Sequence, residues 1–474
     1  MTLRTIFEPL VVLSPSGRFQ PFLASEMKVE DHGRRFRFVL RPNVTFHDGR
    51  PLTSADVQYT IEAVVKRARR YRGTLSLFHA ELLQVQEVRA IDERTVELVL
   101  QRRNHLFPAV LAELPVLPSH LYHKHGLRNP RLSWAPVGTG PFMLAAGQVR
   151  SEYKRSTVTL VRSPSYWGRR PGLSRLVFTA IPDPAAALAR LRNGEIDMIP
   201  NLHPSYYPDQ IKGERMQRRF AAFRILPYRL RLLLFNVRPG PTKDRRVRVA
   251  IAHLADRQRV VREVRNNLGQ VSSIPIWPLS PWYDKSIHPY DYDRPAAARL
   301  LTSAGWKPAK QGGRRLMGGN VPLRLRLLVA RESPQMLLVA NLLKNEIQAS
   351  GGSLEIKVGD FGYVKTRLRR GSFDLALVGI APRPQSDLSP LLHSKGHLNL
   401  GGYKNPVVDR LLDGVRGTSR EGFREELLRQ LYRALHNDPP FLILYTPIEL
   451  MVVSREVKGV ASNGRRPVFS TLSR

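Results

Sequence analysis

Phe36-Arg-Phe-Val-Leu-Arg-Pro-Asn-Val-Thr-Phe-His-Asp-Gly-Arg-Pro-Leu-Thr-Ser-Ala-Asp-Val57 is one continuous block that predicts a strand, a turn and a helix. Its first five residues alternate as in a half-buried strand, and Gly49 can take the positive φ of a turn. Thr53, with Asp56 three residues later, has the pattern of a capping box before an apolar helical stripe. The block therefore predicts a strand–turn–helix unit and carries no catalytic group.

The length and composition indicate a protein with ordinary cores and no membrane span. The 474 residues allow two or three domains, and 42% are hydrophobic. The longest apolar runs stop well short of the ~20 residues that a spanning helix needs. The chain has no cysteine, which excludes disulfides, thiolate nucleophiles and cysteine-ligated metal sites.

The chain is strongly basic, with 75 Lys and Arg against 39 Asp and Glu and a net charge of +36. Such a charge would attract an anionic partner such as nucleic acid or an anionic lipid surface. The basic residues are scattered beside apolar-periodic segments, whereas nucleic-acid binding needs a focused patch. A dispersed, solvated surface is therefore favoured, and no specific nucleic-acid partner is expected. The alternative is a cytosolic or membrane-surface module that uses its basic surface on nucleic acid or lipid.

Two further segments predict α/β units. Asp183 and Gly194 have the positions of an N-cap and a C-terminal glycine around a short helix. Residues 334–350 form a helical pattern between the strand-like segments 323–329 and 354–358. Strand, helix and strand in this order predict a βαβ unit.

The opening block resembles the signature of the family 5 extracellular solute-binding proteins, the peptide and nickel binders of ABC importers. Further landmarks of that family follow in order along nearly the whole chain. Each is weak alone, but their joint order is a strong signal. They are Val137-Gly-Thr-Gly-Pro-Phe142, Tyr166-Trp167-Gly168, Asn193-Gly-Glu-Ile-Asp197, Phe235-Asn236, Asp244-Arg-Arg-Val-Arg-Val-Ala-Ile-Ala252, Ala304-Gly305-Trp306, Phe373-Asp374-Leu375 and Asn405-Pro406-Val-Val-Asp409.

The resemblance implies an α/β, two-lobed fold of the type II periplasmic-binding-protein class with an extra small subdomain. Residues 1–135 would form that subdomain, 136–235 plus 446–474 the main part of lobe one, and 236–445 lobe two. Two chain crossings near residues 236 and 446 would form a hinge, as a closing clamp needs.

The resemblance also implies a function. The chain would be the substrate-binding component of an ABC importer, capturing a peptide or peptide-like solute in an interlobe cleft and delivering it to a membrane permease. We expect a periplasmic monomer without a cofactor. Met1 to Leu10 lacks the pattern of a signal peptide. Family members have a leading strand before the segment that matches Ile6 to Leu10, so the chain is expected to begin late.

No catalytic or metal site is predicted. His120, His123 and His125 could place two imidazoles on one helical face, but no carboxylate flanks them closely, and a surface helix end is the favoured interpretation. The sequence has no G-x-S-x-G elbow, no P-loop and no G-x-G-x-x-G fingerprint before a helix. We therefore expect a binding protein and no enzyme.

The candidate ligand-binding residues come from the family landmarks and from aromatic segments. Trp277 lies in a proline-rich aromatic loop that could line a cleft or pack lobe two, and Phe361 stands where family members have an aromatic cleft wall or serves as a core residue. The full predicted set is Phe235, Asn236, Trp277, Phe361, Gly379, Ile380, Ala381, Arg383 and Asp387.

One part of this set departs from the peptide binders. In those proteins a Gly-Trp pair followed by Asp captures the amino terminus of the peptide, whereas here Ile380 replaces the Trp and Arg383 replaces the Asp. A guanidinium repels an ammonium group and attracts a carboxylate or phosphate. Asp387 could restore the acid if the loop is shifted. The resemblance thus implies solute binding, but the group at the anchor position is positive here, whereas it is negative in the peptide binders.

Overall fold

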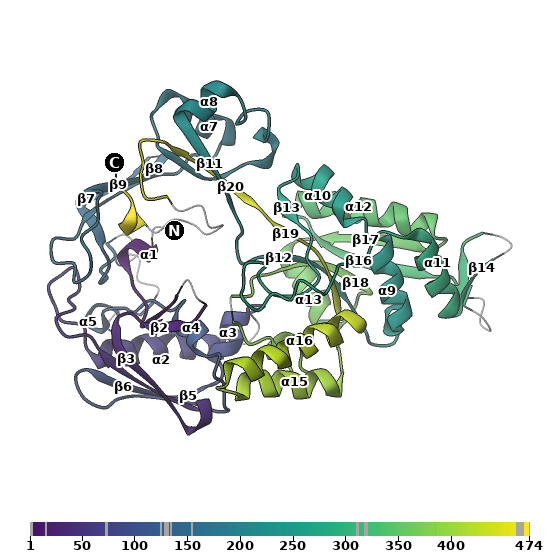
Figure 1. Cartoon of the computed structure of the whole chain (residues 1–474), viewed down its shortest axis with the longest axis horizontal. Coiled ribbons are helices and arrows are strands. Elements are labelled where there is room, and N and C mark those ends of the chain that lie inside the picture. Colours follow the sequence, from purple (N-terminus) through teal and green to yellow (C-terminus); the bar gives the residue numbers. More distant parts are fainter. Residues whose placement is uncertain are drawn as a thin grey trace. The chain divides into compact units, whose positions relative to one another are not determined.

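A computed structural model describes residues 3–14, 17–71, 74–123, 126–127, 132, 135–152, 155–309, 312–316, 321–383, 385–460 and 469–473. The chain divides into two compact units, each with its own sheets and core (Figure 1). Unit 1 comprises residues 1–74, 78–225 and 449–474, and unit 2 comprises residues 75–77 and 226–448. No helix in the described part of the chain has the length and apolarity needed to cross a membrane.

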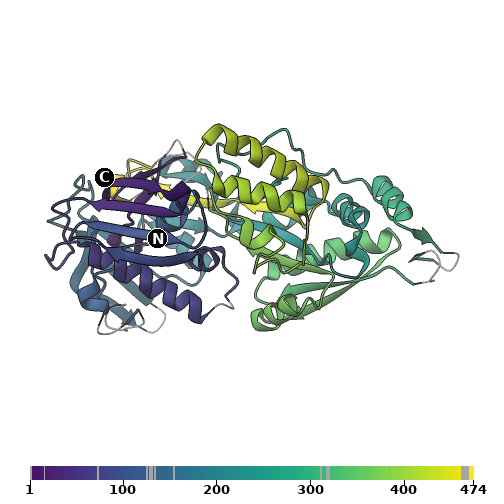
Figure 2. The ribbon, with the colours of Figure 1, turned by 90° about the horizontal axis from the view of Figure 1, so that it is seen from below.

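Unit 1 contains a four-stranded antiparallel sheet with one long helix on its face (Figure 2). The predicted strand–turn–helix block is confirmed there, since the strand spans Arg35–Leu40 and the helix begins at Ser54. The Thr53 N–H donates to Asp56 Oδ2 at 2.9 Å, which caps the helix. The elements are β3 (Ala24–Glu30), β4 (Arg35–Leu40), β6 (Thr95–Leu100), β5 (Val85–Ala90) and α2 (Ser54–Arg70), in sheet order β3-β4-β6-β5.

The rest of unit 1 is built around two three-stranded sheets. The predicted short helix is confirmed, because the Ala185 N–H donates to the Asp183 carboxylate at 2.9 Å and Gly194 ends the helix at a φ of 80°. The elements are β7 (Phe142–Glu152), β8 (Arg155–Arg162), β9 (Arg175–Thr179), α7 (Pro184–Asn193), β10 (Met198–Leu202), α8 (Glu214–Arg219), β11 (Phe220–Ile225) and β20 (Glu449–Ser454). Shorter elements are α1 (Leu3–Ile6), β1 (Val11–Leu13), β2 (Phe19–Pro21), α4 (Pro108–Leu111) and α5 (Ser119–Tyr122).

Unit 2 has a six-stranded sheet in the order β13-β19-β12-β18-β16-β17. The predicted βαβ unit is confirmed, because β16 and β17 pair in parallel and α12 connects them. β18 is parallel to β16, whereas β12 is antiparallel to both β18 and β19. The strands are β12 (Leu230–Phe235), β13 (Gly269–Gln270), β16 (Arg324–Ala330), β17 (Ser353–Gly359), β18 (Leu375–Ile380) and β19 (Phe441–Pro447).

Helices cover both faces of this sheet. One face shares a large apolar core with α9, α10, α11 and α12, and the other face packs against α13. The helices are α9 (Arg245–Leu254), α10 (Arg257–Arg265), α11 (Arg294–Ser303), α12 (Pro334–Ala349), α13 (Phe361–Arg370), α14 (Ser389–Leu392), α15 (Pro406–Gly417) and α16 (Glu421–Asn437). The short strands β14 (Trp306–Pro308) and β15 (Arg314–Leu316) form a separate hairpin.

The observed division of the chain differs from the expected boundaries. The sequence assigned residues 230–235 to lobe one, whereas the structure places this strand, β12, inside the sheet of unit 2. The reason is physical: β12 pairs on one side with β18 and on the other with β19, so its removal would split the sheet. The chain returns from unit 2 to unit 1 between Ile448 and Glu449.

The glycines of the Gly138-Thr-Gly140 landmark allow a close backbone contact in unit 1. A Cβ on Gly138 would lie 2.1 Å from the Ile6 carbonyl oxygen, and one on Gly140 would lie 2.5 Å from the Thr5 carbonyl oxygen. The segment is also held by His47. Its Nε2 lies 2.9 Å from the Gly140 carbonyl oxygen, and its Nδ1 lies 3.3 Å from the Gly138 nitrogen. These contacts fit a neutral imidazole with the proton on Nε2.

This histidine predicts a loss of stability in acid. Burial lowers the pKa of His47 below its ordinary value, so the unfolded chain binds its proton at a higher pH than the folded chain does. The stabilisation by neutral His47 is complete above about pH 6.5, and it is lost as the pH falls from there through the pKa of the folded state. His47→Asn should flatten this part of the pH dependence of the free energy of unfolding, measured by urea denaturation between pH 4.5 and 7.5. His288→Asn, at an exposed position, is the control, and an unchanged slope in His47→Asn would contradict the assignment.

Candidate functional site

The strand order of unit 2 creates a natural binding edge where its parallel strands end. The connection from β16 to β17 runs through α12 on one face of the sheet, and the connection from β17 to β18 runs through α13 on the other. The chain therefore changes faces between the neighbouring strands β16 and β18. In open α/β sheets, ligands bind outside the carboxyl ends of the strands at such a switch point.

Several predicted residues lie at this edge. Gly379 and Ile380 end β18, and Gly379 and Ala381 are exposed. Ile380 is partly buried against the small cluster of Leu230, Leu232 and Ile443. Phe361, two residues after the end of β17, is 62% exposed, and its N–H donates to Glu332 Oε1 at 3.2 Å. The edge thus offers exposed backbone and an exposed aromatic ring.

Arg383 and Asp387 follow on the loop after β18. Burial lowers the pKa of Arg383 to about 10, so its guanidinium is still charged at neutral pH. Asp387 is 2% exposed and accepts the Ser389 N–H at 2.9 Å, close to the start of α14. Asp387 therefore stabilises the local turn, and Arg383 supplies a positive charge to this loop.

Phe235 and Asn236 lie elsewhere on the unit. Because β12 is antiparallel to β18, Phe235 pairs with Leu375 at the amino end of β18, about 13 Å along the strand from Gly379. Phe235 is 0% exposed, and the Asn236 amide donates to the Gly371 and Phe373 carbonyls at 2.9 and 2.7 Å. The structure thus gives both residues a packing role and does not bring them to the carboxyl edge.

Trp277 is also a packing residue within unit 2. Its side chain is 2% exposed and lies edge-on to Tyr228, with 4.7 Å between the ring centroids. Its Nε1–H donates to the Leu226 carbonyl at 3.0 Å. Of the two alternatives for Trp277, lining a cleft or packing lobe two, this burial favours packing.

Sequence reasoning missed Arg231 and Tyr445 at the carboxyl edge. Arg231 is paired across the sheet with Gly379 on one side and Tyr445 on the other. Burial raises the pKa of Tyr445, whereas the charges of Arg265 and Arg231 and a hydrogen bond from Arg231 lower it. The available signal was an arginine inside the otherwise apolar strand 230–235.

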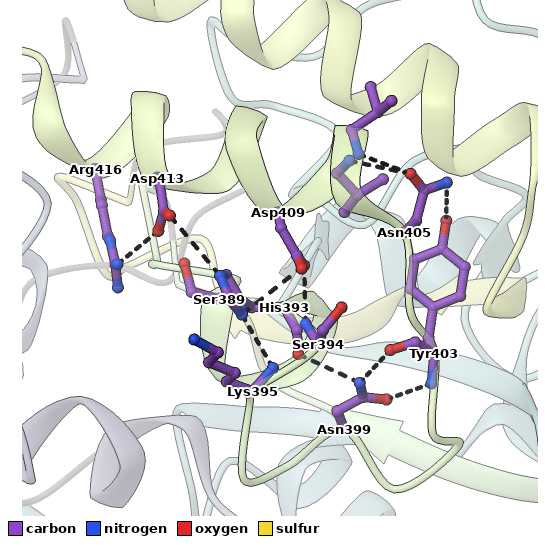
Figure 3. A network of polar contacts seen from close by, with 12 residues as sticks. Ser389, His393, Ser394, Lys395, Asn399, Tyr403, Asn405, Asp409, Asp413 and Arg416 are labelled. Carbon is purple, nitrogen blue, oxygen red and sulfur yellow. Dashed lines mark hydrogen bonds and ion pairs between the residues drawn. The ribbon is translucent and has the colours of Figure 1, made fainter.

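A polar network that joins α15 to the segment before it superficially resembles a catalytic triad (Figure 3). His393 lies between Asp409 and Asp413, with each nearest nitrogen–oxygen distance 3.8 Å. His393 Nδ1 accepts the Lys395 N–H at 3.0 Å, and Ser389 Oγ has no hydrogen-bond partner in the described part of the chain. A serine nucleophile needs a hydrogen bond to a base, and Ser389 has none to His393. The contacts of the network therefore stabilise the conformation of this loop.

The candidate metal-like histidines have separate partners. His120 Nε2 lies 2.7 Å from Asp48 Oδ2, and the His123 ring packs against Tyr59 at 5.3 Å. His125 lies outside the described residues. Over the ranges that the structure describes, no three or more His, Cys, Asp or Glu side chains gather as metal ligands would.

Comparison with known proteins places this geometry in context. Residues 18–399 match the family model of the bacterial extracellular solute-binding proteins, family 5 (middle). Protein XP55 of Streptomyces lividans is 29% identical over 467 residues, covering 96% of this chain and 81% of that protein. The nickel-binding periplasmic protein of Escherichia coli is 24% identical, covering 96% and 86%. The structure of the oligopeptide-binding protein AppA from Bacillus subtilis with a nonapeptide has a TM-score of 0.76 at 21% identity, covering 99% and 93%.

Proposed function

Because the chain belongs to the family 5 bacterial extracellular solute-binding proteins, the binding components of ABC importers, we propose that it captures a peptide or peptide-like solute and delivers it to a membrane permease. The similar proteins include a nickel binder and an oligopeptide binder. We propose that this chain acts outside the cytoplasm, and that it is a monomer without catalytic activity.

The observation that carries the peptide proposal is the end of β18 at the switch point. Gly379 and Ala381 are exposed there, and Gly379 presents only backbone atoms; an extended peptide can be held by backbone hydrogen bonds whatever its side chains are. Phe361, which is 62% exposed, follows the end of β17 by two residues, and β17 is two strands from β18 in the sheet. This distance is about 10 Å, which an extended chain of three residues spans.

The proposal also accounts for the reversed charge at the anchor position. Arg383 is cationic at neutral pH and stands where peptide binders have an acid. A solute with a carboxylate near this loop would gain charge-assisted hydrogen bonds. We therefore propose that Gly379, Ile380, Ala381 and Arg383 contact the solute.

The test is native mass spectrometry of protein purified without denaturation, followed by dissociation of the bound species. Short peptides or peptide-like acids at one per chain are the expected result. A bound lipid or nucleic-acid fragment, with no saturable binding of a peptide mixture added afterwards, would contradict the proposal.

A further inference from the structure

Arg231 is a charged group that the packing of unit 2 does not explain. It is partly buried, it lies in the apolar strand β12, and no carboxylate in the described part of the chain forms an ion pair with it. Partly burying a charge costs free energy unless a partner of opposite charge is supplied. A residue of this kind at the carboxyl edge, next to the switch point, points to a partner that comes from outside the chain.

The structure makes room for the guanidinium. Its Nη1 lies over Gly379 on the neighbouring strand, and a Cβ built on that glycine would be 2.2 Å from Nη1. Gly379 has an ordinary strand conformation, so its lack of a side chain is needed for space. An alanine at this position would force Arg231 to move.

Tyr445 lies beside Arg231 on the other neighbouring strand. It pairs with Arg231 in the ladder of β12 and β19, its side chain is 1% exposed, and burial raises the pKa of its hydroxyl, which the nearby Arg231 guanidinium lowers. Arg231 has five N–H donors in a rigid fork, so contact with one phenol oxygen leaves most of them for a ligand. Tyr445 is therefore a positioning residue for Arg231.

The surroundings make this point of the edge more positive. Arg265 is 8% exposed, and its charge acts on Tyr445 together with that of Arg231. Arg265 Nη1 donates to Gln335 Oε1 at 3.1 Å, which ties it to the first turn of α12. The charges of Arg265 and Arg231 both act on Tyr445, so this part of the edge favours an anion.

We propose that Arg231, held between Gly379 and Tyr445, is a subsite for a carboxylate of the transported solute. That the bound molecule is the transported solute rests on the proposed function, whereas the binding of a carboxylate rests on Arg231 itself. A guanidinium binds a carboxylate through two parallel N–H···O bonds. The subsite selects solutes that carry a carboxylate and discriminates against their amides.

The experiment compares two probes of matched composition. One is a digest of casein into di- to pentapeptides, and the other is the same digest after amidation of all its carboxyl groups. Binding to the wild-type chain is measured by native mass spectrometry and titration calorimetry. The acid digest should bind about ten- to hundredfold more tightly, the range expected for charge-assisted hydrogen bonds.

The variants separate the subsite from general charge. Arg231→Ala and Gly379→Ala should both reduce the preference for the acid digest to the part that Arg383 alone supplies, and Arg231→Lys should reduce it less, since ammonium is a point charge. Tyr445→Phe should reduce it less. Arg324→Ala is the matched control, because Arg324 is exposed at the amino end of β16, on the opposite edge of the same sheet. Thermal unfolding checks that each variant is folded.

The outcomes distinguish the two proposals. If both digests bind equally, or the preference in Arg231→Ala is as large as in the wild-type chain, the subsite is overturned while peptide capture stands. If neither digest binds, peptide capture fails, and a mixture of N-acetyl amino acids then tests the subsite alone. Saturable binding that Arg231→Ala removes would support it, and no binding to the wild-type chain would overturn it.

Discussion

Glu8→Ala is expected to destabilise unit 1 by about 3–6 kcal/mol, because it leaves three hydrogen-bond donors without an acceptor, and each such loss costs about 1–2 kcal/mol where the donors are only partly buried. Glu8 is 4% exposed and accepts three hydrogen bonds from neutral groups. The donors are Thr139 Oγ1 at 2.9 Å, Tyr166 OH at 2.8 Å and Trp167 Nε1 at 2.9 Å. Urea denaturation followed by tryptophan fluorescence is the measurement.

Glu8→Gln is the matched variant. Its carbonyl oxygen can accept from Thr139 and Trp167, and its amide can donate to the Tyr166 oxygen, so it should retain most of the stability. Burial raises the pKa of Glu8. The folded chain therefore holds this proton more tightly than the unfolded chain, and stability falls as the pH rises from about 4.5 through the raised pKa. Glu8→Gln should lack this dependence. A glutamine variant as unstable as the alanine variant would disprove the hydrogen-bond explanation.

Arg383→Ala is expected to weaken solute binding by about ten- to hundredfold. Charge-assisted hydrogen bonds are worth about 1.5–3 kcal/mol, and about 1.4 kcal/mol corresponds to one decade in affinity. The group is charged at neutral pH, since burial lowers its pKa only to about 10. Titration calorimetry with one peptide found by native mass spectrometry, and with its C-terminally amidated form, measures the loss.

Asp387→Asn should change binding little, because this side chain is buried and accepts the Ser389 N–H, which an amide oxygen can also do. Equal affinity of the acid and amidated peptides, or a large loss in Asp387→Asn alone, would mean that the acid is the anchor and that it captures an ammonium group.

Local patterns were sufficient for much of the fold. The capping box at Thr53 and Asp56, and the helix boundaries at Asp183 and Gly194, depend on neighbours within a few residues, so the sequence predicts them. The parallel pair β16 and β17 followed from the order strand, helix, strand. The family landmarks extended this to the architecture of the whole chain.

The candidate site was less predictable because it depends on pairing between distant segments. Phe235 and Asn236 are at the amino end of β18 only because β12 runs antiparallel to it, and no local pattern reports that direction. The burial of Trp277 depends on Tyr228, about fifty residues earlier in the sequence. Arg231 pairs with Gly379 on one side and with Tyr445 on the other. The local sequence of its own strand cannot predict these neighbours.

The position of β20 has a consequence for the synthesis of the chain. This strand, Glu449–Ser454, is the middle strand of the sheet β10-β20-β11, whose outer strands end at Leu202 and Ile225. A ribosome makes both outer strands more than two hundred residues before the strand that joins them. Until then β10 and β11 present unpaired edges, which invite association with other chains. All of unit 2 is synthesised before β20, so unit 2 can fold while unit 1 still lacks its last strand.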